Sequence, residues 1–262
     1  MKEGLTMKVH VLYLGRLDCK KYHLVKCSDE QTDILSPISA ILIQHPTLGN
    51  ILYDTGNSPL YNKEYTYEML TTYPVGEFIS IESALAKYGL NVDDIDMIIL
   101  SHLHFDHVGG LCYFKNTKAI KNVIVSKAEL KNAYWETMTD QGGAYIKSLL
   151  NVDGVVYKTI ENDIELAPDL YLFIQSSHTP GVIGLILSTQ TKGNIIVTSD
   201  TIYTRENYDS ELPPGGNINK STIDFWDNLK ELKKMKEKYK AELLFGHDYE
   251  QIIEWANNPN IY

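Results

Sequence analysis

Short apolar runs alternate with polar turns along this chain, and most of the runs have the length of a β-strand. Residues 8–14, 38–45 and 50–54 are rich in β-branched and aliphatic side chains, and the Pro-Thr-Leu-Gly sequence at 46–49 separates the last two. These patterns predict a strand followed by a strand–turn–strand unit. Further strands are predicted at 97–100, 123–125, 155–159, 170–175, 183–189, 195–198 and 243–246. We assign 155–159, 170–175, 183–189 and 195–198 to a second sheet, with a hairpin turn at 192–194.

Three segments have helical spacing. Ser80 can cap a helix over 81–88 that stops at Gly89, and Ser126 can cap a helix over 126–137, with Glu129 completing a capping box. The longest helix is predicted over 222–239. Its apolar stripe is expected to pack in the core rather than bind a cofactor, and consists of Phe225, Trp226, Leu229, Leu232, Met235 and Tyr239.

These elements predict an α+β protein in which two sheets are flanked by helices. The chain has 262 residues, which is enough for a sizeable core, and it contains no internal repeat and no low-complexity linker. We therefore expect one domain over residues 1–262, with its two halves meeting near residues 150–160.

Composition and charge exclude several classes. A hydrophobic content of 44% and a charged content of 22% are typical of a globular protein. The net charge of −10 argues against a nucleic-acid partner, which requires a basic face. The sequence contains no run of 18 apolar residues, so no membrane span is predicted. The apolar run at 9–14 is too short for a signal peptide and is soon broken by Arg16 and Asp18.

The cysteines indicate a reducing compartment. Cys19, Cys27 and Cys112 are an odd number at unpatterned spacings, which favours the cytoplasm. Cys112 lies close to a histidine-rich stretch, so it is a possible ligand there, but we interpret it as a buried small hydrophobic residue.

That stretch is the most informative one in the chain. Residues 101–110 read Ser-His-Leu-His-Phe-Asp-His-Val-Gly-Gly and follow the apolar run 97–100. In an extended backbone, residues i and i+2 point the same way and lie roughly 6.6–6.8 Å apart, so His102 and His104 can bind one ion. Asp106 and His107 point apart unless the chain bends, and they suit a second ion. The alternative is a polar loop that happens to contain histidines. A structural zinc site fits poorly, because such sites are usually rich in cysteine.

Three further polar residues stand directly after short apolar runs. His178 follows 170–174, Asp200 follows 195–199, and His247 follows 243–246. Strand ends would bring these side chains to one edge of the fold. His10, His23 and His45 lack this setting and are expected to be ordinary surface or core residues.

These motifs resemble those of the metallo-β-lactamase superfamily. The resemblance lies in the HxHxDH stretch, the His-Thr-Pro-Gly turn at 178–181, the Ser-Asp pair at 199–200 and the Gly-His-Asp sequence at 246–248. Residues 199–208 and 245–251 are similar to the N-acyl-homoserine lactonases, the quorum-quenching branch. The family often has a second histidine after the Pro-Gly of the turn, and Val182 stands there instead. That histidine is not a ligand in the family pattern, so the departure concerns local packing.

The resemblance implies a four-layer αβ/βα sandwich, with two mixed β-sheets packed face to face and helices outside. It also implies a centre of two divalent metal ions. In the family pattern His102, His104 and His178 hold one ion, Asp106, His107 and His247 hold the other, and Asp200 bridges them. Zinc suits these ligands best, with iron, manganese and cobalt as alternatives.

The implied activity is the opening of a lactone ring, with N-acyl-homoserine lactones as the expected substrates, by a hydroxide that bridges the two ions. Asp106 and Tyr203 are the candidate catalytic residues. The family uses a tyrosine three residues after the bridging Asp200, where its phenol could hydrogen-bond the developing oxyanion. The alternative for Tyr203 is a residue that only packs a loop.

Other functions stay open on the same motifs. The first is another ester, thioester or lactone hydrolase, such as one of the glyoxalase II type, and the second is a metal-binding protein without catalysis. Cleavage of β-lactams is disfavoured, because no export signal is seen and Asp106 and Tyr203 follow the lactonase pattern. The expected partner is a small lactone, with no nucleic acid and no membrane, and the chain is expected to be a monomer or a homodimer.

Two segments near the motif have two interpretations each. Asp54 either holds a ligating imidazole by its outer N–H group, as the resemblance implies, or simply forms a turn before Gly56. The tyrosine-rich stretch 57–74 is either a flap over the site or a surface loop fixed by its rings. Phe105 could line a cleft for an acyl chain.

Overall fold

The first sheet of the molecule is mixed and has seven strands in the order β4-β1-β2-β3-β5-β6-β7. In this computed structural model, which describes residues 7–26, 29–141, 143–215 and 222–258, strands β1 to β3 are antiparallel and β3, β5, β6 and β7 are parallel. The strands are β1 Lys8–Lys20, β2 Asp33–His45, β3 Gly49–Tyr53, β4 Val75–Phe78, β5 Met97–Ile99, β6 Val123–Ser126 and β7 Tyr157–Ile160.

The second sheet has five strands in the order β12-β11-β10-β9-β8. Its neighbours are antiparallel except β11 and β12, which run parallel. The strands are β8 Ile164–Ala167, β9 Leu170–Gln175, β10 Val182–Thr189, β11 Gly193–Ser199 and β12 Glu242–Phe245. The predicted turn between β10 and β11 is confirmed, and Gly193 takes a φ of 68° there, a value that favours glycine.

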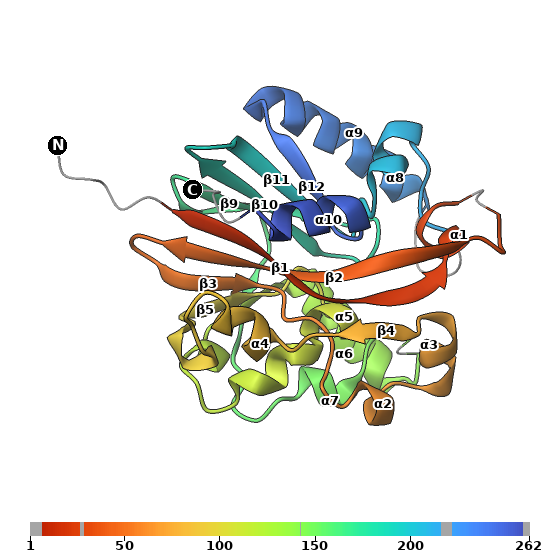
Figure 1. The fold of residues 1–262 in the computed structure, drawn as a ribbon, viewed down its shortest axis with the longest axis horizontal. Helices are drawn as coiled ribbons and strands as arrows, with labels where there is room; N and C mark the ends of the chain where they lie inside the picture. The colour runs from red at the N-terminus through yellow and green to blue at the C-terminus, as the bar shows by residue number, and fades with distance from the viewer. Residues whose placement is uncertain (1–6, 27–28, 142, 216–221, 259–262) are drawn as a thin grey trace.

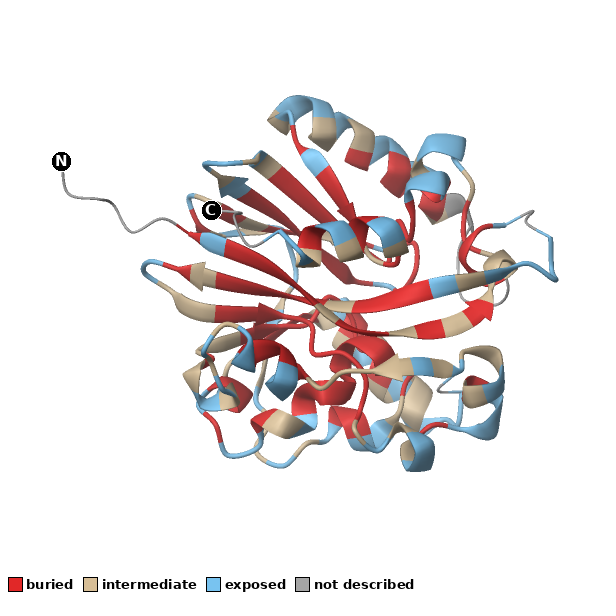
Figure 2. Ribbon diagram, viewed as in Figure 1, coloured by how far each residue is buried: buried red, intermediate tan, exposed pale blue. Residues whose placement is uncertain are grey.

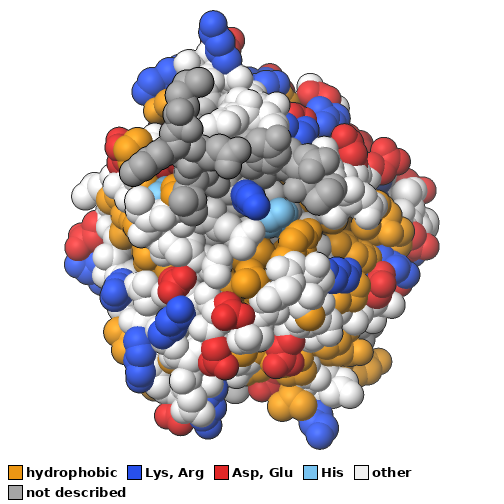
Figure 3. All heavy atoms as spheres, turned by 60° about the vertical axis from the view of Figure 1, so that its left-hand side comes forward, with side chains coloured by type: hydrophobic (Ala, Val, Ile, Leu, Met, Phe, Trp, Pro, Cys, Tyr) orange, Lys and Arg blue, Asp and Glu red, His pale blue; other side chains and the backbone are white. Residues whose placement is uncertain are grey.

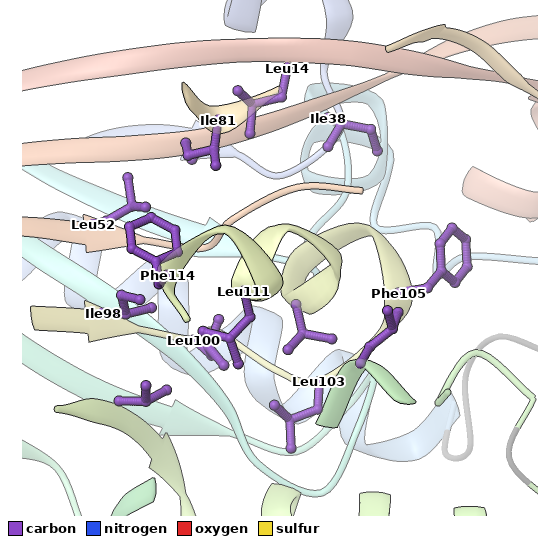
Figure 4. Close-up of a cluster of buried hydrophobic side chains, with 14 of the residues drawn as sticks. Leu14, Ile38, Leu52, Ile81, Ile98, Leu100, Leu103, Phe105, Leu111 and Phe114 are labelled. Atoms are coloured by element: carbon purple, nitrogen blue, oxygen red, sulfur yellow. The ribbon is translucent and has the colours of Figure 1, made fainter. Parts of the chain in front are cut away.

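The two sheets pack face to face (Figures 1 and 2), and the buried side chains form separate clusters between the sheets and on their outer faces. Val9, Ile43 and Leu172 belong to the cluster between the sheets. The opposite face of the first sheet packs on the helices drawn in the lower half of Figure 1, and Figure 4 shows Leu52 and Leu100 in this cluster. The outer face of the second sheet is covered by α9. The predicted four-layer sandwich is therefore confirmed.

Most helices lie on the outer faces of the sheets, whereas α10 lies between β1 and β12 and contributes Ile252 and Trp255 to the core between the sheets (Figure 1). The longer ones are α6 Lys127–Met138, α9 Thr222–Tyr239 and α10 Tyr249–Ala256. The shorter ones are α1 Lys21–Leu24, α2 Tyr61–Glu64, α3 Tyr67–Thr72, α4 Ile81–Ala86, α5 Phe105–Val108, α7 Lys147–Leu150 and α8 Arg205–Ser210, together with the 3₁₀ turns η1 Val92–Asp94, η2 Gly109–Phe114 and η3 Ala119–Lys121. No helix in the described part of the chain is long and apolar enough to cross a membrane.

The assignment of 155–159 to the second sheet is wrong. The strand here is β7, and it pairs in parallel with β6 at the edge of the first sheet. The polypeptide changes sheets only afterwards, between β7 and β8. The four-residue strands β4 and β8 were not predicted, and β1 continues beyond residue 14 through a register shift between Tyr13 and Arg16. Gly15 lies in that shift with a φ of 103°.

The helix predictions hold with two corrections. Ser80 and Ser126 cap their helices as expected, each accepting a hydrogen bond from the backbone N–H three residues on. The capping box at α6 is wrong, because the Glu129 carboxylate accepts from the backbone N–H of Leu103 instead. Trp226 is not in the core, since it is 46% exposed and donates its indole N–H to the Glu211 carbonyl. It lies outside the buried stripe, in which Phe225, Leu229 and Leu232 pack on the second sheet.

The surface carries charges of both signs. Figure 3 shows acidic and basic side chains interspersed on the face drawn there, with hydrophobic side chains gathered beside them. No continuous basic surface is visible on that face of the described residues.

Candidate metal centre

The ends of four strands bring the predicted ligands together. His102 and His104 follow β5, and the short helix α5 that comes next carries Asp106 and His107. His178 follows β9, Asp200 follows β11 and His247 follows β12. Both sheets therefore contribute to one centre, as expected from the position of these residues after apolar runs. The side chains form three overlapping groups: His102 with His104 and His178, His102 with His107 and Asp200, and Asp106 with His107 and His247.

Three imidazole nitrogens meet in the first cluster. His178 Nε2 lies 3.2 Å from His102 Nε2 and 2.9 Å from His104 Nδ1. The rings are nearly perpendicular, with interplanar angles of 89° between His102 and His178 and 85° between His104 and His178. The ring nitrogens thus point at a common position instead of stacking. His104 uses Nδ1 where the other two use Nε2.

The second cluster is built around Asp200. His107 Nε2 and His247 Nε2 both lie 3.2 Å from Asp200 Oδ1, and Asp106 Oδ2 lies 3.6 Å from His107 Nε2. The other oxygen, Asp200 Oδ2, lies 3.4 Å from His178 Nε2 in the first cluster. Asp200 Oδ2 is also 3.3 Å from His247 Nε2, so the carboxylate lies between the two clusters, within reach of ligand nitrogens from both, as a bridging ligand requires.

The outer nitrogen of each of three imidazoles has its own polar partner. Asp54 Oδ2 lies 2.8 Å from His107 Nδ1, and Tyr203 Oη lies 2.9 Å from His178 Nδ1. His247 Nδ1 lies 3.0 Å from the carbonyl oxygen of Pro37. Such contacts fix the tautomer and the orientation of a ligating ring. The interpretation of Asp54 as the partner of an imidazole is confirmed, and its φ of 62° turns the chain at the same point.

The electrostatics favour a cation here. Although burial opposes the charge of Asp200, the surrounding histidines, His247 first among them, hold its pKa well below the ordinary value. Burial also lowers the pKa of His107, but the carboxylates of Asp200, Asp106 and Asp54 outweigh it and raise that pKa well above the ordinary value. The three carboxylates around this buried imidazole thus stabilise positive charge at the site.

The donor set fits two metal ions. His107 Nε2 and Asp200 Oδ1 are buried, and within the described residues neither has a hydrogen-bond partner in acceptable geometry. In the first cluster, three nitrogens crowd together although a neutral imidazole offers only one lone pair and one N–H group. Cations would accept the lone pairs of both clusters and supply partners for these buried atoms.

The other predicted residues divide into two groups. Tyr203 lies at the centre, buried against His178. Cys112 belongs to none of the ligand groups found in the described residues: it is exposed, and its thiol lies 3.6 Å from the Gly109 carbonyl oxygen. The expectation that Cys112 is buried is therefore wrong. Cys19 is buried and unpaired, and Cys27 lies outside the described residues. As expected, His10, His23 and His45 belong to none of the ligand groups found in the described residues.

Several rings hold the tyrosine-rich segment on the core, and Tyr65 is the most deeply buried of them. Tyr65 is buried and packs edge-on against Phe105, with ring centroids 4.8 Å apart. Its hydroxyl lies 2.9 Å from Asn57 Oδ1 and accepts from the backbone N–H of Ser58 at 3.1 Å. By contrast, Tyr67 is 86% exposed. This geometry is that of a loop held on the core. The role of Phe105 in an acyl cleft stays a prediction.

Sequence reasoning missed several supporting residues. Ser36 Oγ lies 3.0 Å from His247 Nδ1, from a strand 211 residues away in the chain, and no local signal marks it. Ser101 Oγ lies 3.0 Å from His102 Nδ1 and donates to Asp54. Its place directly before the first ligand could have indicated this role. Asp248 caps α10 by accepting from Gln251 N–H, which the Gly-His-Asp motif alone does not reveal.

Comparison with known proteins gives a consistent result. The metallo-beta-lactamase superfamily model matches residues 34–247. An N-acyl homoserine lactonase from Bacillus sp is 34% identical over 210 residues, covering 78% of each chain. The lactonase AttM of Azorhizobium caulinodans is 23% identical and 98% of each chain is covered. A mutant of the lactonase AiiA from B. thuringiensis, solved with N-decanoyl-L-homoserine at its active site, has a TM-score of 0.81 and 28% identity over 98% of this chain and 99% of that one.

Proposed function

The chain belongs to the metallo-beta-lactamase superfamily, and we propose that it opens the ester ring of lactones, with N-acyl-homoserine lactones as its preferred substrates. The observation that carries this proposal is the convergence of five histidines and two aspartates into two ligand clusters that share Asp200. The similarity to N-acyl homoserine lactonases supports the substrate class. A solved lactone hydrolase that is 28% identical holds N-hexanoyl-L-homoserine at its catalytic metal centre.

We assign the two ions to the ligands as follows. His102, His104 and His178 would hold one ion, and Asp106, His107 and His247 the other. Asp200 would bridge them, because its carboxylate lies close to His178 of the first set and to His247 of the second. Zinc suits this set, since imidazole and carboxylate are among its usual ligands. When bound, such a pair of cations makes a water nucleophilic near neutral pH and polarises a carbonyl.

Two residues of the chain itself would handle the proton and the developing charge. If His178 Nδ1 carries its proton and donates it to the phenol oxygen, the O–H of Tyr203 is left free. The phenol can then donate that hydrogen to the carbonyl oxygen of the lactone. Burial, and then the charge of Asp200, raise the pKa of Tyr203 well above its ordinary value, which keeps the phenol protonated. In the reaction, the water oxygen adds to the carbonyl carbon and the ring C–O bond breaks. We propose that Asp106 takes the proton that water loses and returns it to the leaving alkoxide.

The leaving group explains the preference for lactones. An alkoxide is a strong base, so it needs a proton or a positive charge as the ring opens, and the cluster that contains Asp106 can provide both. A thiolate leaves without such help. An acyl tail would strengthen substrate binding by roughly 0.8 kcal/mol for each CH₂ that becomes buried.

The cellular location and the oligomeric state are inferred from less evidence than the reaction. We propose a cytoplasmic location, which the two described cysteines support because both are unpaired. The expectation of a monomer or homodimer stays a prediction.

A substrate panel tests the proposal. Metal-loaded protein should be assayed for kcat/KM on homoserine lactones of several acyl lengths, simple lactones, a glutathione thioester and a cephalosporin. We expect the highest value on an acyl-homoserine lactone and a KM that falls stepwise with tail length until the cleft is full. A best rate on the thioester or the cephalosporin would contradict the proposal. Equal rates on all lactones would leave the chemistry intact and remove the preference for acyl chains.

A further inference from the structure

The first turn of α6 contacts both loops that carry the three-histidine cluster. His102 and His104 come from the loop after β5, and His178 comes from the loop between β9 and β10. These loops are far apart in sequence, so contacts elsewhere in the fold must fix their position relative to each other. Ser126 and Glu129, at the start of α6, each reach one of them.

Glu129 fixes the first loop. Its side chain is fully buried, and Oε1 accepts a hydrogen bond of 2.8 Å from the backbone N–H of Leu103. Leu103 lies between the two histidines, so this bond sets the direction of the backbone from which both rings project. A buried backbone N–H group that lacks a hydrogen-bond partner is costly, because it no longer contacts water. A bond of this kind can therefore define the loop geometry.

Ser126 fixes the second loop. Its hydroxyl accepts from Glu129 N–H as the helix cap and donates to the carbonyl oxygen of Gly181 at 2.7 Å. Gly181 ends the turn that begins at His178, and a Cβ atom there would collide with Ser126 Oγ. The close approach of helix and turn thus requires glycine at this position. One serine joins the cap of α6 to the loop of the third histidine.

Tyr145 adds a third contact from the same region. Its ring lies edge-on to the His104 ring, with centroids 4.5 Å apart, and its hydroxyl accepts from Asn132 Nδ2 on α6 at 3.1 Å. The same helix therefore supports the backbone between two ligands, the turn after the third, and one ring from the side.

We propose that Ser126 and Glu129 are positioning residues that set the metal affinity of the three-histidine cluster selectively. The other cluster has separate support, since Asp54 and the Pro37 carbonyl hold His107 and His247. The contacts of α6 therefore reach one ion directly, and they reach the other only through His102 and the shared Asp200. This inference rests on the proposed function, because it concerns the metal centre of that reaction.

Metal titration of the apo-protein tests the inference without any substrate. Wild type, Glu129→Ala, Glu129→Gln and Ser126→Ala should be titrated with Zn²⁺ against a chromophoric chelator. We expect Glu129→Ala to weaken one of the two ions by roughly 10–100-fold, the range for loss of an outer partner of a ligand, and to leave the other unchanged. Glu129→Gln keeps an oxygen acceptor for Leu103 N–H, so it should restore most of the affinity.

Ring-nitrogen NMR identifies the ion that is affected. In Glu129→Ala with one equivalent of Zn²⁺, the signals of His107 and His247 should move to metal-bound positions, while those of the three-histidine cluster stay free. Equal weakening of both ions, or full affinity in Glu129→Ala, would overturn the inference.

Ser80→Ala is the matched control for Ser126→Ala. Both serines cap a helix by accepting from the N–H three residues on, but only Ser126 also donates to a ligand loop. We expect Ser126→Ala to weaken the same ion as Glu129→Ala, and Ser80→Ala to weaken neither. A similar effect of both serine variants would reduce the role to helix stability and contradict the inference. Because no lactone is present, failure of the proposed activity would not alter these outcomes.

Discussion

At the scale of single residues, Tyr203 has a partner on the protein and a proposed partner on the substrate. Replacing it by phenylalanine removes the phenol but keeps the ring. We expect kcat on the best lactone to fall on the order of 10²-fold, the usual effect of losing one oxyanion donor. Because the phenol also contacts His178, the variant should be loaded at saturating metal, where elemental analysis should find the wild-type metal content. An unchanged kcat would mean that the phenol serves only His178.

Cys112 gives a prediction about pH. Partial burial raises the pKa of its thiol to about 11, so the thiol is protonated at pH 8 and becomes reactive only as the pH rises toward that value. Labelling by iodoacetamide, followed by mass spectrometry of the Cys112 peptide, should speed up roughly tenfold for each pH unit between 8 and 10. Cys112→Ser provides the blank. Rapid labelling at pH 7 would show that the thiol is not shielded.

Residue chemistry was the most predictable level. All seven proposed ligands could be found because imidazoles and carboxylates after apolar runs are local signals. Their outer partners were harder, because Ser36 meets His247 only through packing of the two sheets. Glu129 was recognised as part of a helix start, but its partner, Leu103, is 26 residues away and no sequence pattern indicates it.

At the scale of elements, α9 should stabilise the fold without affecting the metal centre. Leu232 is fully buried between this helix and the outer face of the second sheet. Leu232→Ala should lower the free energy of unfolding by about 2–5 kcal/mol, which denaturant titration of the apo-protein can measure. The exposed Lys234→Ala on the same helix should stay within about 0.5 kcal/mol of wild type. Equal effects of both variants would contradict the assignment of this core.

Elements were predicted well where their pattern was long. The stripe of α9 and the apolar runs of β9, β10 and β11 led to correct assignments. β4 and β8 were missed because glycine or glutamate interrupts each of them, so neither forms a continuous apolar run like those of the equally short β6 and β12. For β7, composition cannot tell which sheet a strand joins. That choice depends on its parallel pairing with β6, more than 30 residues earlier.

At the scale of the whole molecule, metal binding should stabilise the fold. The ligands come from both sheets, so ions that bind only the native state link the two halves of the chain. Each ion should raise the free energy of unfolding by about 2.7 kcal/mol when its free concentration is 100 times its Kd. Calorimetry should therefore show a rise in Tm when Zn²⁺ is added to the apo-protein. Asp200 contacts both clusters, so Asp200→Ala should lose most of this rise in Tm. A full rise in the variant would argue against a shared ligand.

The most direct measurement is the rate of lactone opening as apo-protein is reconstituted with Zn²⁺. Product formation from an acyl-homoserine lactone should be followed while the metal is raised stepwise from zero to several equivalents per chain. If both clusters form the reactive centre, the rate should reach its plateau only at two equivalents. A full rate at one equivalent, or no lactone opening at two, would contradict the account of a two-metal lactonase.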